Sequence, residues 1–343
     1  MRRKFPLSKG LFAAVAWLAV AAAPMAARAE TTLEVAYIPI MPMAPLYVME
    51  GEGWTKEAGL DLKLTKFSSG PAMVQAIASG KYDVMYFGIG PAMVSRANGV
   101  PIKVVAGSVM EQIGLVAQGD FAKTMKAAKT PAEGVHAFTK AAGRKPKIAS
   151  LPKGSVPDAV FRHWVLRVAG LKVEDFDIVG MGEDKVQQAV LTRSVDAASI
   201  LEPVVTIIRE RLPDATLIAA GGQMFKGQPG AVVAVRESTL AEKRAAIVKL
   251  VALHIRAVAL IKSDPKRAAK SVHEFLGKGL VPLETIEKAM TSPISNFVAN
   301  PHDIMAPSQE MQDFSAEIGT LKKPVKISDL YDTSVYDQAV KKP

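Results

Sequence analysis

The sequence predicts an α/β protein with two lobes, one of them inserted into the other. Three observations predict this fold class: strands alternate with helices, the alternation starts twice, and two short apolar runs bound the second series. Strand–helix–strand units at this spacing build mainly parallel sheets. Because ligands of open α/β sheets bind at the carboxyl ends of the strands, we expect a ligand cleft between the lobes.

The first series runs from residue 32 to residue 106. Apolar and polar residues alternate in segments that predict strands, namely Thr32–Ile38, Leu60–Phe67, Asp83–Phe87 and Ile102–Ala106. The segments between them predict helices, namely Ala44–Glu52, Pro71–Ser79 and Pro91–Ala97. Gly80 follows the second of these helices, as glycine commonly does at a helix C-terminus.

The second series repeats this order after a Lys- and Ala-rich segment, 119–146, that is either helical or loop-like. Strands are predicted at Lys147–Ser150, Phe176–Val179, Ala197–Ile200 and Thr216–Ala219, and helices at Val156–Ala169 and Val186–Leu191. The apolar runs Ile113–Ala117 and Ala231–Val235 are expected to be strands that connect the lobes. Only helices are expected after the second run, starting with Leu240–Ile261. We therefore assign residues 30–116 and 231–343 to lobe I and residues 117–230 to lobe II.

Residues 1–29 have the pattern of a cleavable signal peptide. A basic start, an apolar run and the small-residue site Ala27-Arg28-Ala29 follow one another. The apolar run is too short to span a membrane. The chain has no cysteine, so no lipid can be attached through a thioether. We expect the mature protein to be soluble in the periplasm and to rest on its hydrophobic core without disulfides.

The charge of the chain does not indicate a nucleic-acid partner. The formal net charge is +10, and five of the basic residues lie in residues 1–29, which contain no acid. The remaining chain therefore carries +5, without a basic run or interleaved aromatic residues. This charge is compatible with an anionic ligand but does not require one.

Four turns at expected strand ends share one anatomy, in which a small residue or glycine precedes a helix start. They are Pro42-Met43-Ala44, Ser68-Ser69-Gly70, Gly88-Ile89-Gly90 and Gly154-Ser155. Free N–H groups at a helix start favour negative charge by about 0.3–2 kcal/mol, so these turns are candidate anion sites. The alternative is that they are ordinary helix caps.

The pentapeptide GPAMV occurs in two of these turns, at Gly70–Val74 and Gly90–Val94. We interpret it as one kind of strand-to-helix turn used twice. Glu202 follows the strand 197–200 and could accept a hydrogen bond from an amine or hydroxyl group of a ligand. The alternative for Glu202 is a surface acid before a helix.

The sequence offers no positive case for catalysis. The five histidines are scattered without a metal-binding spacing, and neither a G-x-S-x-G motif nor a phosphate-binding G-x-x-x-x-G-K motif occurs. We expect no enzyme activity, no cofactor and no metal. His254 lies on the apolar face of its helix and is interpreted as a core residue.

Several stretches resemble one family over nearly the whole chain after residue 29. They are AIASGKYDVMYFGIGPAM, PKGSVPDAVFRHWVLRVAGLKVEDFDIVGM and AVLTRSVDAASILEP, with the opening AYIPIMPMAPLYVMEGEGW and the C-terminal QDFSAEIGTLKKPVKISDLYD. They resemble the periplasmic solute-binding proteins of ABC importers of the nitrate/sulfonate/taurine type, which have an NMT1/THI5-like domain. Ser194 stands where this family usually has glycine, and Leu201 where an aromatic residue often precedes Glu-Pro.

The resemblance implies a type II periplasmic-binding-protein fold that closes like a hinge on its ligand. It also implies a monomer that docks transiently on the membrane subunits of an ABC permease. By carry-over, the ligand-binding residues are Pro42, Met43, Ala44, Ser68, Ser69, Gly70, Gly88, Ile89, Gly90, Gly154, Ser155 and Glu202.

We therefore expect a protein that captures a small organic anion or zwitterion, like a sulfonate, taurine or nitrate, and delivers it to a permease. Because the ring that often precedes Glu-Pro is missing, a different ligand remains open, such as a thiamine-precursor pyrimidine or another ring compound. An NMT1/THI5-like enzyme and a sensor that docks to a receptor are further alternatives.

Overall fold

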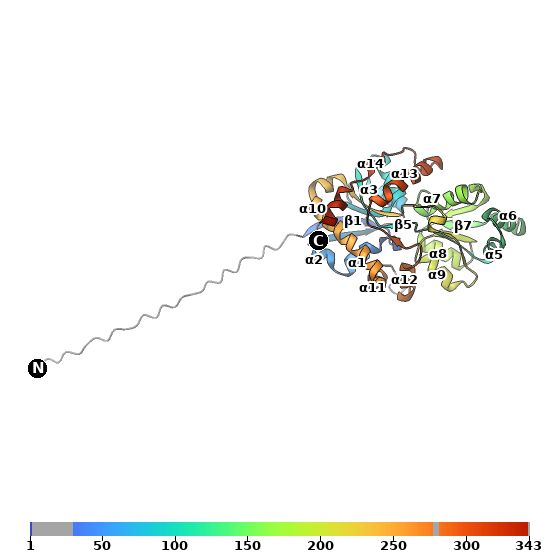
Figure 1. The fold of residues 1–343 in the computed structure, drawn as a ribbon, viewed down its shortest axis with the longest axis horizontal. Coiled ribbons are helices and arrows are strands. Elements are labelled where there is room, and N and C mark those ends of the chain that lie inside the picture. The colour runs from blue at the N-terminus through green and yellow to red at the C-terminus, as the bar shows by residue number, and fades with distance from the viewer. Residues whose placement is uncertain (2–29, 277–280, 342–343) are drawn as a thin grey trace.

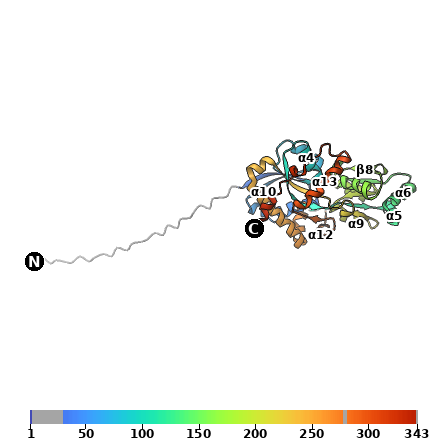
Figure 2. The ribbon, with the colours of Figure 1, turned by 45° about the horizontal axis from the view of Figure 1, so that its top comes forward.

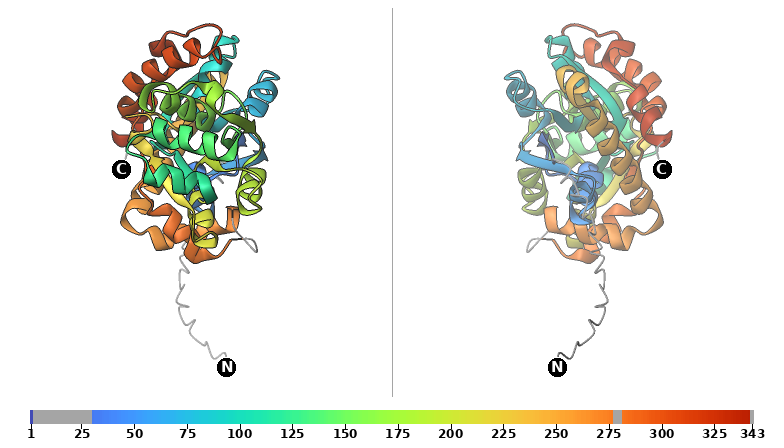
Figure 3. Two further views of the ribbon diagram at one scale, coloured as in Figure 1. Left: turned by 90° about the vertical axis from the view of Figure 1, so that its right-hand side faces the viewer. Right: turned by 90° about the vertical axis from the view of Figure 1, so that its left-hand side faces the viewer.

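The computed structural model describes residue 1 and residues 30–276 and 281–341, so the predicted signal peptide lies almost entirely outside the described residues. The molecule has two lobes side by side along its long axis (Figure 1). Lobe I contains the N-terminal (blue) and C-terminal (orange to red) segments, whereas lobe II contains the green and yellow segments. The end-on views in Figure 3 look at lobe II on the left and at lobe I on the right.

Lobe I is built on a five-stranded sheet with the order β2-β1-β3-β11-β4. Its strands are β1 (Thr31–Tyr37), β2 (Leu60–Lys66), β3 (Val84–Gly88), β4 (Ile102–Gly107) and β11 (Ala231–Arg236). Strand β1 runs parallel to β2 and β3, whereas β11 runs antiparallel to β3 and β4. The connecting helices are α1 (Ala44–Gly51), α2 (Trp54–Glu57), α3 (Gly70–Ile77) and α4 (Ile89–Ala97).

Lobe II repeats this plan with the strand order β10-β6-β9-β7-β8. Its strands are β6 (Gly114–Ala117), β7 (Lys147–Ser150), β8 (Asp177–Gly180), β9 (Ala197–Ile200) and β10 (Thr216–Ala220). Strand β7 is parallel to β8 and β9, and β6 is antiparallel to β9 and β10. Its helices are α5 (Gly119–Ala127), α6 (Pro131–Ala142), α7 (Val156–His163), α8 (Glu183–Leu191) and α9 (Val204–Arg211).

The C-terminal part is mainly helical and belongs to lobe I. It contains α10 (Glu237–Ser263), α11 (Pro265–Leu276), α12 (Leu283–Met290), α13 (His302–Glu317), α14 (Ile327–Leu330) and α15 (Ser334–Lys341). Figure 2 shows α13 next to lobe II, to which an ion pair between Glu317 and Arg167 links it. None of the helices in the described ranges combines the length and the apolar composition that a membrane span needs.

The strands predicted from the sequence are confirmed, each within one residue of its expected ends. Segment 119–146 forms two helices, and the predicted helix 156–169 is α7 followed by a π-helical turn, Trp164–Val168. The expectation of helices only after residue 235 is wrong, because β12 (Asn296–Phe297) pairs with β5 (Val109–Met110). Two-residue strands are too short to show an alternating pattern.

Two chain segments cross between the lobes and pair with each other. The backbone N–H of Ser108 donates to Ala231 (2.9 Å), that of Glu111 to Gln228 (2.8 Å) and that of Gly230 to Val109 (3.0 Å). We call these paired segments, 108–113 and 228–231, the hinge. The predicted lobe boundary at residues 116 and 117 falls at the end of β6, which already pairs within the sheet of lobe II.

His254 is a fully buried residue of α10, as expected for a core histidine. Its Nε2 lies 2.7 Å from the backbone carbonyl oxygen of Gly107, the last residue of β4 before the hinge. Burial lowers the pKa of His254 to about 4, although the hydrogen bond to Gly107 acts in the opposite direction. The native protein therefore keeps this imidazole neutral at pH values where the unfolded chain protonates it.

We expect His254 to make the protein sensitive to acid. Because its native pKa is lowered, its contribution to stability is present above pH 6.5 and is lost as the pH falls towards 4, up to about 3 kcal/mol. His254→Gln keeps an N–H donor for Gly107 but does not titrate. In urea unfolding at a series of pH values, this variant should lose less stability between pH 6.5 and 4 than the wild type. His136→Gln, which changes an exposed histidine, is the control, and equal pH dependence in all three proteins would contradict the prediction.

Candidate ligand-binding site

The two sheets present the carboxyl ends of their parallel strands to each other. The turns that follow these strands are 38–44, 67–70 and 88–90 in lobe I, and 151–156, 181–183 and 201–203 in lobe II. All twelve residues predicted as ligand contacts lie in these turns or at the helix starts that follow them. The sequence-based expectation that ligand candidates gather at strand ends thus agrees with the fold.

A cavity of about 350 Å³ lies between the lobes at the ends of β1, β2, β7 and β8. It is lined from lobe I by Ile38, Pro39, Ile40, Ser68 and Ser69, and from lobe II by Leu151, Pro152, Gly182, Glu183, Asp184 and Lys185. This volume lies in the range of small-molecule sites, about 300–1,000 Å³. We call it the interlobe cavity.

Of the residues predicted as ligand contacts, Ser68 and Ser69 line the interlobe cavity. The Ser69 hydroxyl oxygen accepts a hydrogen bond from the backbone N–H of Ala72 (3.3 Å) and thereby caps α3. Ser68 is exposed, so its hydroxyl is more accessible to a ligand than that of Ser69. The hydroxyl of Tyr47 lies behind the lobe I wall, 3.2 Å from each of the carbonyl oxygens of Ile38 and Ile40, and fixes that turn.

The two copies of GPAMV contact each other. A Cβ atom placed on Gly70, in the first copy, would lie 2.3 Å from Cγ of Pro91 in the second. Glycine at position 70 therefore lets α3 and α4 begin side by side. Gly70 is buried against Pro91 and does not line the interlobe cavity.

The turn at Gly88–Gly90 meets the turn at Gly154–Ser155 across the lobes. A Cβ atom on Gly88 would lie 2.8 Å from Cγ2 of Val156, and one on Gly90 would lie 3.5 Å from the carbonyl oxygen of Gly154. A void of only about 10 Å³ remains beside Gly90 and Gly154. The structure packs these two predicted turns against each other and leaves no space for a ligand between Gly90 and Gly154.

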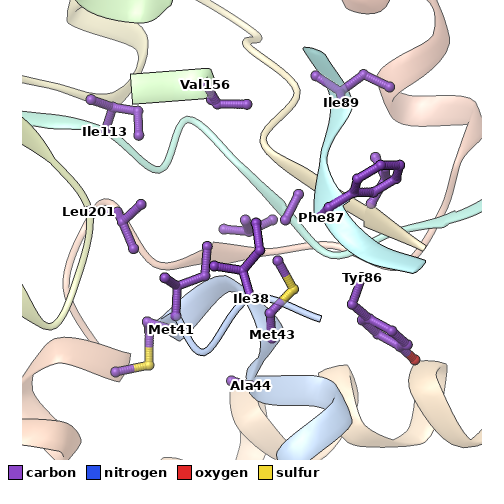
Figure 4. Close-up of a cluster of buried hydrophobic side chains, with 14 of the residues drawn as sticks. Ile38, Met41, Met43, Ala44, Tyr86, Phe87, Ile89, Ile113, Val156 and Leu201 are labelled. Carbon is purple, nitrogen blue, oxygen red and sulfur yellow. The ribbon is translucent and has the colours of Figure 1, made fainter. Parts of the chain in front are cut away.

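Apolar side chains fill the centre of the interface between the lobes. Figure 4 shows Met41 and Met43 of lobe I in one cluster with Val156 and Leu201 of lobe II. The predicted residues Met43, Ala44 and Ile89 are buried in this cluster. The carbonyl oxygen of Pro42 accepts a hydrogen bond from the hydroxyl of Ser108 at the hinge (2.5 Å).

Glu202 is buried rather than on the surface, with 3 % of its area exposed. One carboxylate oxygen accepts a hydrogen bond from the backbone N–H of Thr206 (2.9 Å), in the first turn of α9. Burial raises the pKa of Glu202, while hydrogen bonds from Ser292 and Thr206 partly offset this rise. Glu202 and Pro42 both line a void of about 10 Å³, and Glu202 does not line the interlobe cavity.

Asp158 occupies the start of α7 in a similar way. Its carboxylate accepts a hydrogen bond from the backbone N–H of Gly154 (3.1 Å) and pairs with Arg162 (2.9 Å). The hydroxyl of Ser155, at the N-cap of this helix, is buried and has no hydrogen-bond partner among the described residues. The positive ends of α7 and α9 thus already hold carboxylates of the chain itself, which weakens their attraction for an anionic ligand.

Glu183, the first residue of α8, was missed in the sequence analysis. It lines the interlobe cavity, and its Oε1 is buried without a hydrogen-bond partner among the described residues. Burial raises its pKa well above the usual value, and the adjacent Asp184 adds to this rise. The predicted helix began three residues later, at Val186, and an acid in a first turn is so common that it gave no signal.

A larger open hollow of about 680 Å³ lies at the amino ends of β7 and β8, at the far end of the lobe II sheet. Both of its arginines are engaged, because Arg144 pairs with Asp196 (2.6 Å) and Arg193 with Asp214 (2.7 Å). Within the described part of the chain, no three His, Asp or Glu side chains are placed to hold a metal ion. The interlobe cavity is therefore the better candidate for a ligand site.

Comparisons with known proteins agree with this architecture. A model of the NMT1-like family matches residues 26–276. A Brucella abortus protein, provisionally named a binding protein, is 28% identical over 283 residues, which cover 81% of this chain and 82% of the relative.

Two solved structures show the same two-lobed fold at low sequence identity. The periplasmic nitrate-binding protein of Synechocystis has a TM-score of 0.75 at 15% identity and covers 91% of this chain and 88% of its own. The alkanesulfonate-binding protein of Xanthomonas axonopodis, bound to MOPS, has a TM-score of 0.70 at 16% identity, covering 89% and 99%. The predicted fold, two α/β lobes of the periplasmic-binding-protein type, is confirmed.

We expect Gly88→Ala to oppose closing of the lobes, because its Cβ would collide with Val156. Overpacking of this kind costs about 1–3 kcal/mol. The radius of gyration, measured by small-angle X-ray scattering, should increase, and the second change Val156→Ala should restore it. Gly90→Ala, whose Cβ has an ordinary contact with Gly154, is the matched control. The same radius of gyration in both single variants would show that the contact between Gly88 and Val156 does not limit closing.

Glu202→Ala should lower the free energy of unfolding by about 1–3 kcal/mol, because it removes a buried cap of α9. Urea unfolding measures this change. Glu242→Ala, at an exposed position of α10, should change it by less than about 0.5 kcal/mol. Unchanged stability of Glu202→Ala, together with lost ligand affinity, would instead make Glu202 a ligand-binding residue.

Proposed function

Because the chain belongs to the NMT1-like family, we propose that it is the substrate-binding component of an ABC importer. In this proposal it captures a small organic ligand between its two lobes and delivers it to the membrane subunits of a permease. The predicted signal peptide at residues 1–29 supports a place in the periplasm, where such a component meets its ligand.

The observation that carries this proposal is the interlobe cavity. Both lobes contribute walls to it, and both do so with turns at the carboxyl ends of their strands. A ligand in this position contacts both lobes only when they are closed. It therefore stabilises the closed form by its differential affinity, which is how a binding protein reports its ligand to a permease.

The walls of the interlobe cavity support an organic ligand more than a bare inorganic ion. Ile38, Pro39, Ile40, Leu151 and Pro152 provide apolar surface. Nitrate has no apolar part that could contact this surface. An apolar part is present in a sulfonate, in an amino-sulfonate such as taurine and in a ring compound such as a pyrimidine.

The polar residues of the cavity support a zwitterion among these ligands. Lys185 and the hydroxyl of Ser68 offer donors to an oxyanion, while Glu183 and Asp184 offer acceptors. A purely anionic ligand uses only the first pair. We therefore propose a zwitterion of the taurine kind, with a pyrimidine-like ring compound as the second candidate because of the apolar walls.

We further propose that this role involves no catalysis. If the protein were an enzyme that uses a nucleophile, a residue other than cysteine would have to provide it, because the chain has no cysteine. Two acids at the helix starts of lobe II, Asp158 and Glu202, already accept hydrogen bonds within the protein. Binding, closing and release need no further chemistry.

A screen of the purified protein tests the proposed function. Taurine, ethanesulfonate, nitrate and 4-aminomethylpyrimidine are added in turn, and the melting temperature and the radius of gyration are measured. A ligand at about a hundred times its Kd stabilises the folded state by about 2.7 kcal/mol. We expect taurine or the pyrimidine to raise the melting temperature by several degrees and to decrease the radius of gyration. If no compound of any class does so in a wider screen of periplasmic solutes, the proposed function is wrong.

A further inference from the structure

The carboxylate of Glu183 differs from the other acids at the helix starts of lobe II. Asp158 accepts a hydrogen bond from Gly154 and pairs with Arg162, and Glu202 accepts one from Thr206. Glu183 has a buried oxygen without a hydrogen-bond partner among the described residues. The side chain as a whole is half-buried, but this one oxygen has lost water and gained no hydrogen bond in return, which is costly.

The groups around Glu183 do not offset this cost. Asp184, the next residue in the chain, carries a like charge and raises the pKa of Glu183 further. The hydroxyl of Tyr47 donates to the carbonyl oxygens of Ile38 and Ile40 and not to Glu183. Lys185 lines the same cavity but forms no ion pair with Glu183 within the described residues. The hydrogen bond that Oε1 of Glu183 lacks can therefore be supplied by a group from outside the chain.

The position of Glu183 indicates what that partner is. Its side chain is part of the wall of the interlobe cavity, opposite Ile38, Pro39 and Ile40 of lobe I. A carboxylate accepts hydrogen bonds and attracts positive charge. Groups of this complementary kind are protonated amines, amidines and ring N–H groups.

We propose that Glu183 selects ligands that carry a protonated amine or another N–H donor, by accepting a hydrogen bond from it inside the interlobe cavity. This inference rests on the proposed function, since it needs a ligand between the lobes. It assigns to Glu183 the recognition of a donor group that the sequence indicates for Glu202. The apolar body of such a ligand packs on Ile38 and Leu151, and an oxyanion, where present, lies towards Ser68 or Lys185.

The protonation of Glu183 supports this assignment. Burial raises its pKa and so shifts Glu183 towards the protonated, neutral form. A cationic amine bound beside it favours the ionised form and so lowers this pKa. Affinity for an amine ligand should therefore decrease as the pH falls below the raised pKa of Glu183.

Two pairs of compounds that differ only in an amine test the inference. They are taurine with ethanesulfonate, and 4-aminomethylpyrimidine with 4-methylpyrimidine. Isothermal titration calorimetry at pH 7 gives the Kd of each compound for the wild type, Glu183→Gln and Glu174→Gln. Glu174→Gln removes an exposed carboxylate of lobe II that does not line the interlobe cavity, and it is the matched control.

We expect the amine member of at least one pair to bind the wild type about tenfold or more tightly than its partner compound. Glu183→Gln should reduce this preference by about tenfold or more, whereas Glu174→Gln should change it by less than about threefold. An equal preference in the wild type and Glu183→Gln, or tighter binding of the compounds without the amine, would overturn the inference. Binding of none of the four compounds would also overturn it. Closing on another compound in the wider screen would still leave the proposed function standing.

The empty protein provides a second readout that also shows whether the variant folds. Because the native pKa of Glu183 is raised, its burial lowers stability increasingly as the pH rises above its unfolded value of about 4.5. The melting temperature of Glu183→Gln should therefore match that of the wild type near pH 4 and exceed it by a growing margin towards pH 7. A lower melting temperature at pH 7 would mean that Glu183 has a stabilising partner within the protein.

Discussion

The paired hinge segments, 108–113 and 228–231, determine how the two lobes face each other. Their backbone hydrogen bonds tie the chain leaving lobe I to the chain returning to it. Beyond the hinge, β6 and β11 each enter a sheet antiparallel to their neighbours. This arrangement turns the carboxyl ends of both sets of parallel strands towards one interface. The close pairing needs Gly230, where a Cβ would lie 2.8 Å from the carbonyl oxygen of Val109.

The interface has an apolar centre and a cavity at one side. Met41, Met43, Val156 and Leu201 exclude water from the centre, and every Å² of apolar surface buried there favours closing by about 25 cal/mol. The interlobe cavity lies to one side, at the ends of β1, β2, β7 and β8. The apolar contact therefore favours closing for any ligand, whereas the proposed function assigns the choice of ligand to the residues of the interlobe cavity.

The sequence predicted the strands and the strand-end turns because both depend on local patterns. Apolar alternation marks each strand, and glycine or proline marks each helix start. The role of Gly70 could not be predicted, because its partner Pro91 is brought to it by the packing of α3 on α4. Glu202 and Glu183 look alike in sequence, since each follows a strand of lobe II. Only the fold shows that one carboxylate turns back to cap α9 and the other lines a cavity.

The central claim is that the two lobes close on a ligand between them, and a distance across the interface tests it most directly. The chain has no cysteine, so Lys66→Cys and Gln188→Cys place two spin labels at exposed positions, one in each lobe near the interlobe cavity. Double electron–electron resonance then gives the label-to-label distances with and without a ligand found by screening. The account predicts a shift to a shorter and narrower distribution when the ligand is bound. An identical distribution in both states would contradict it.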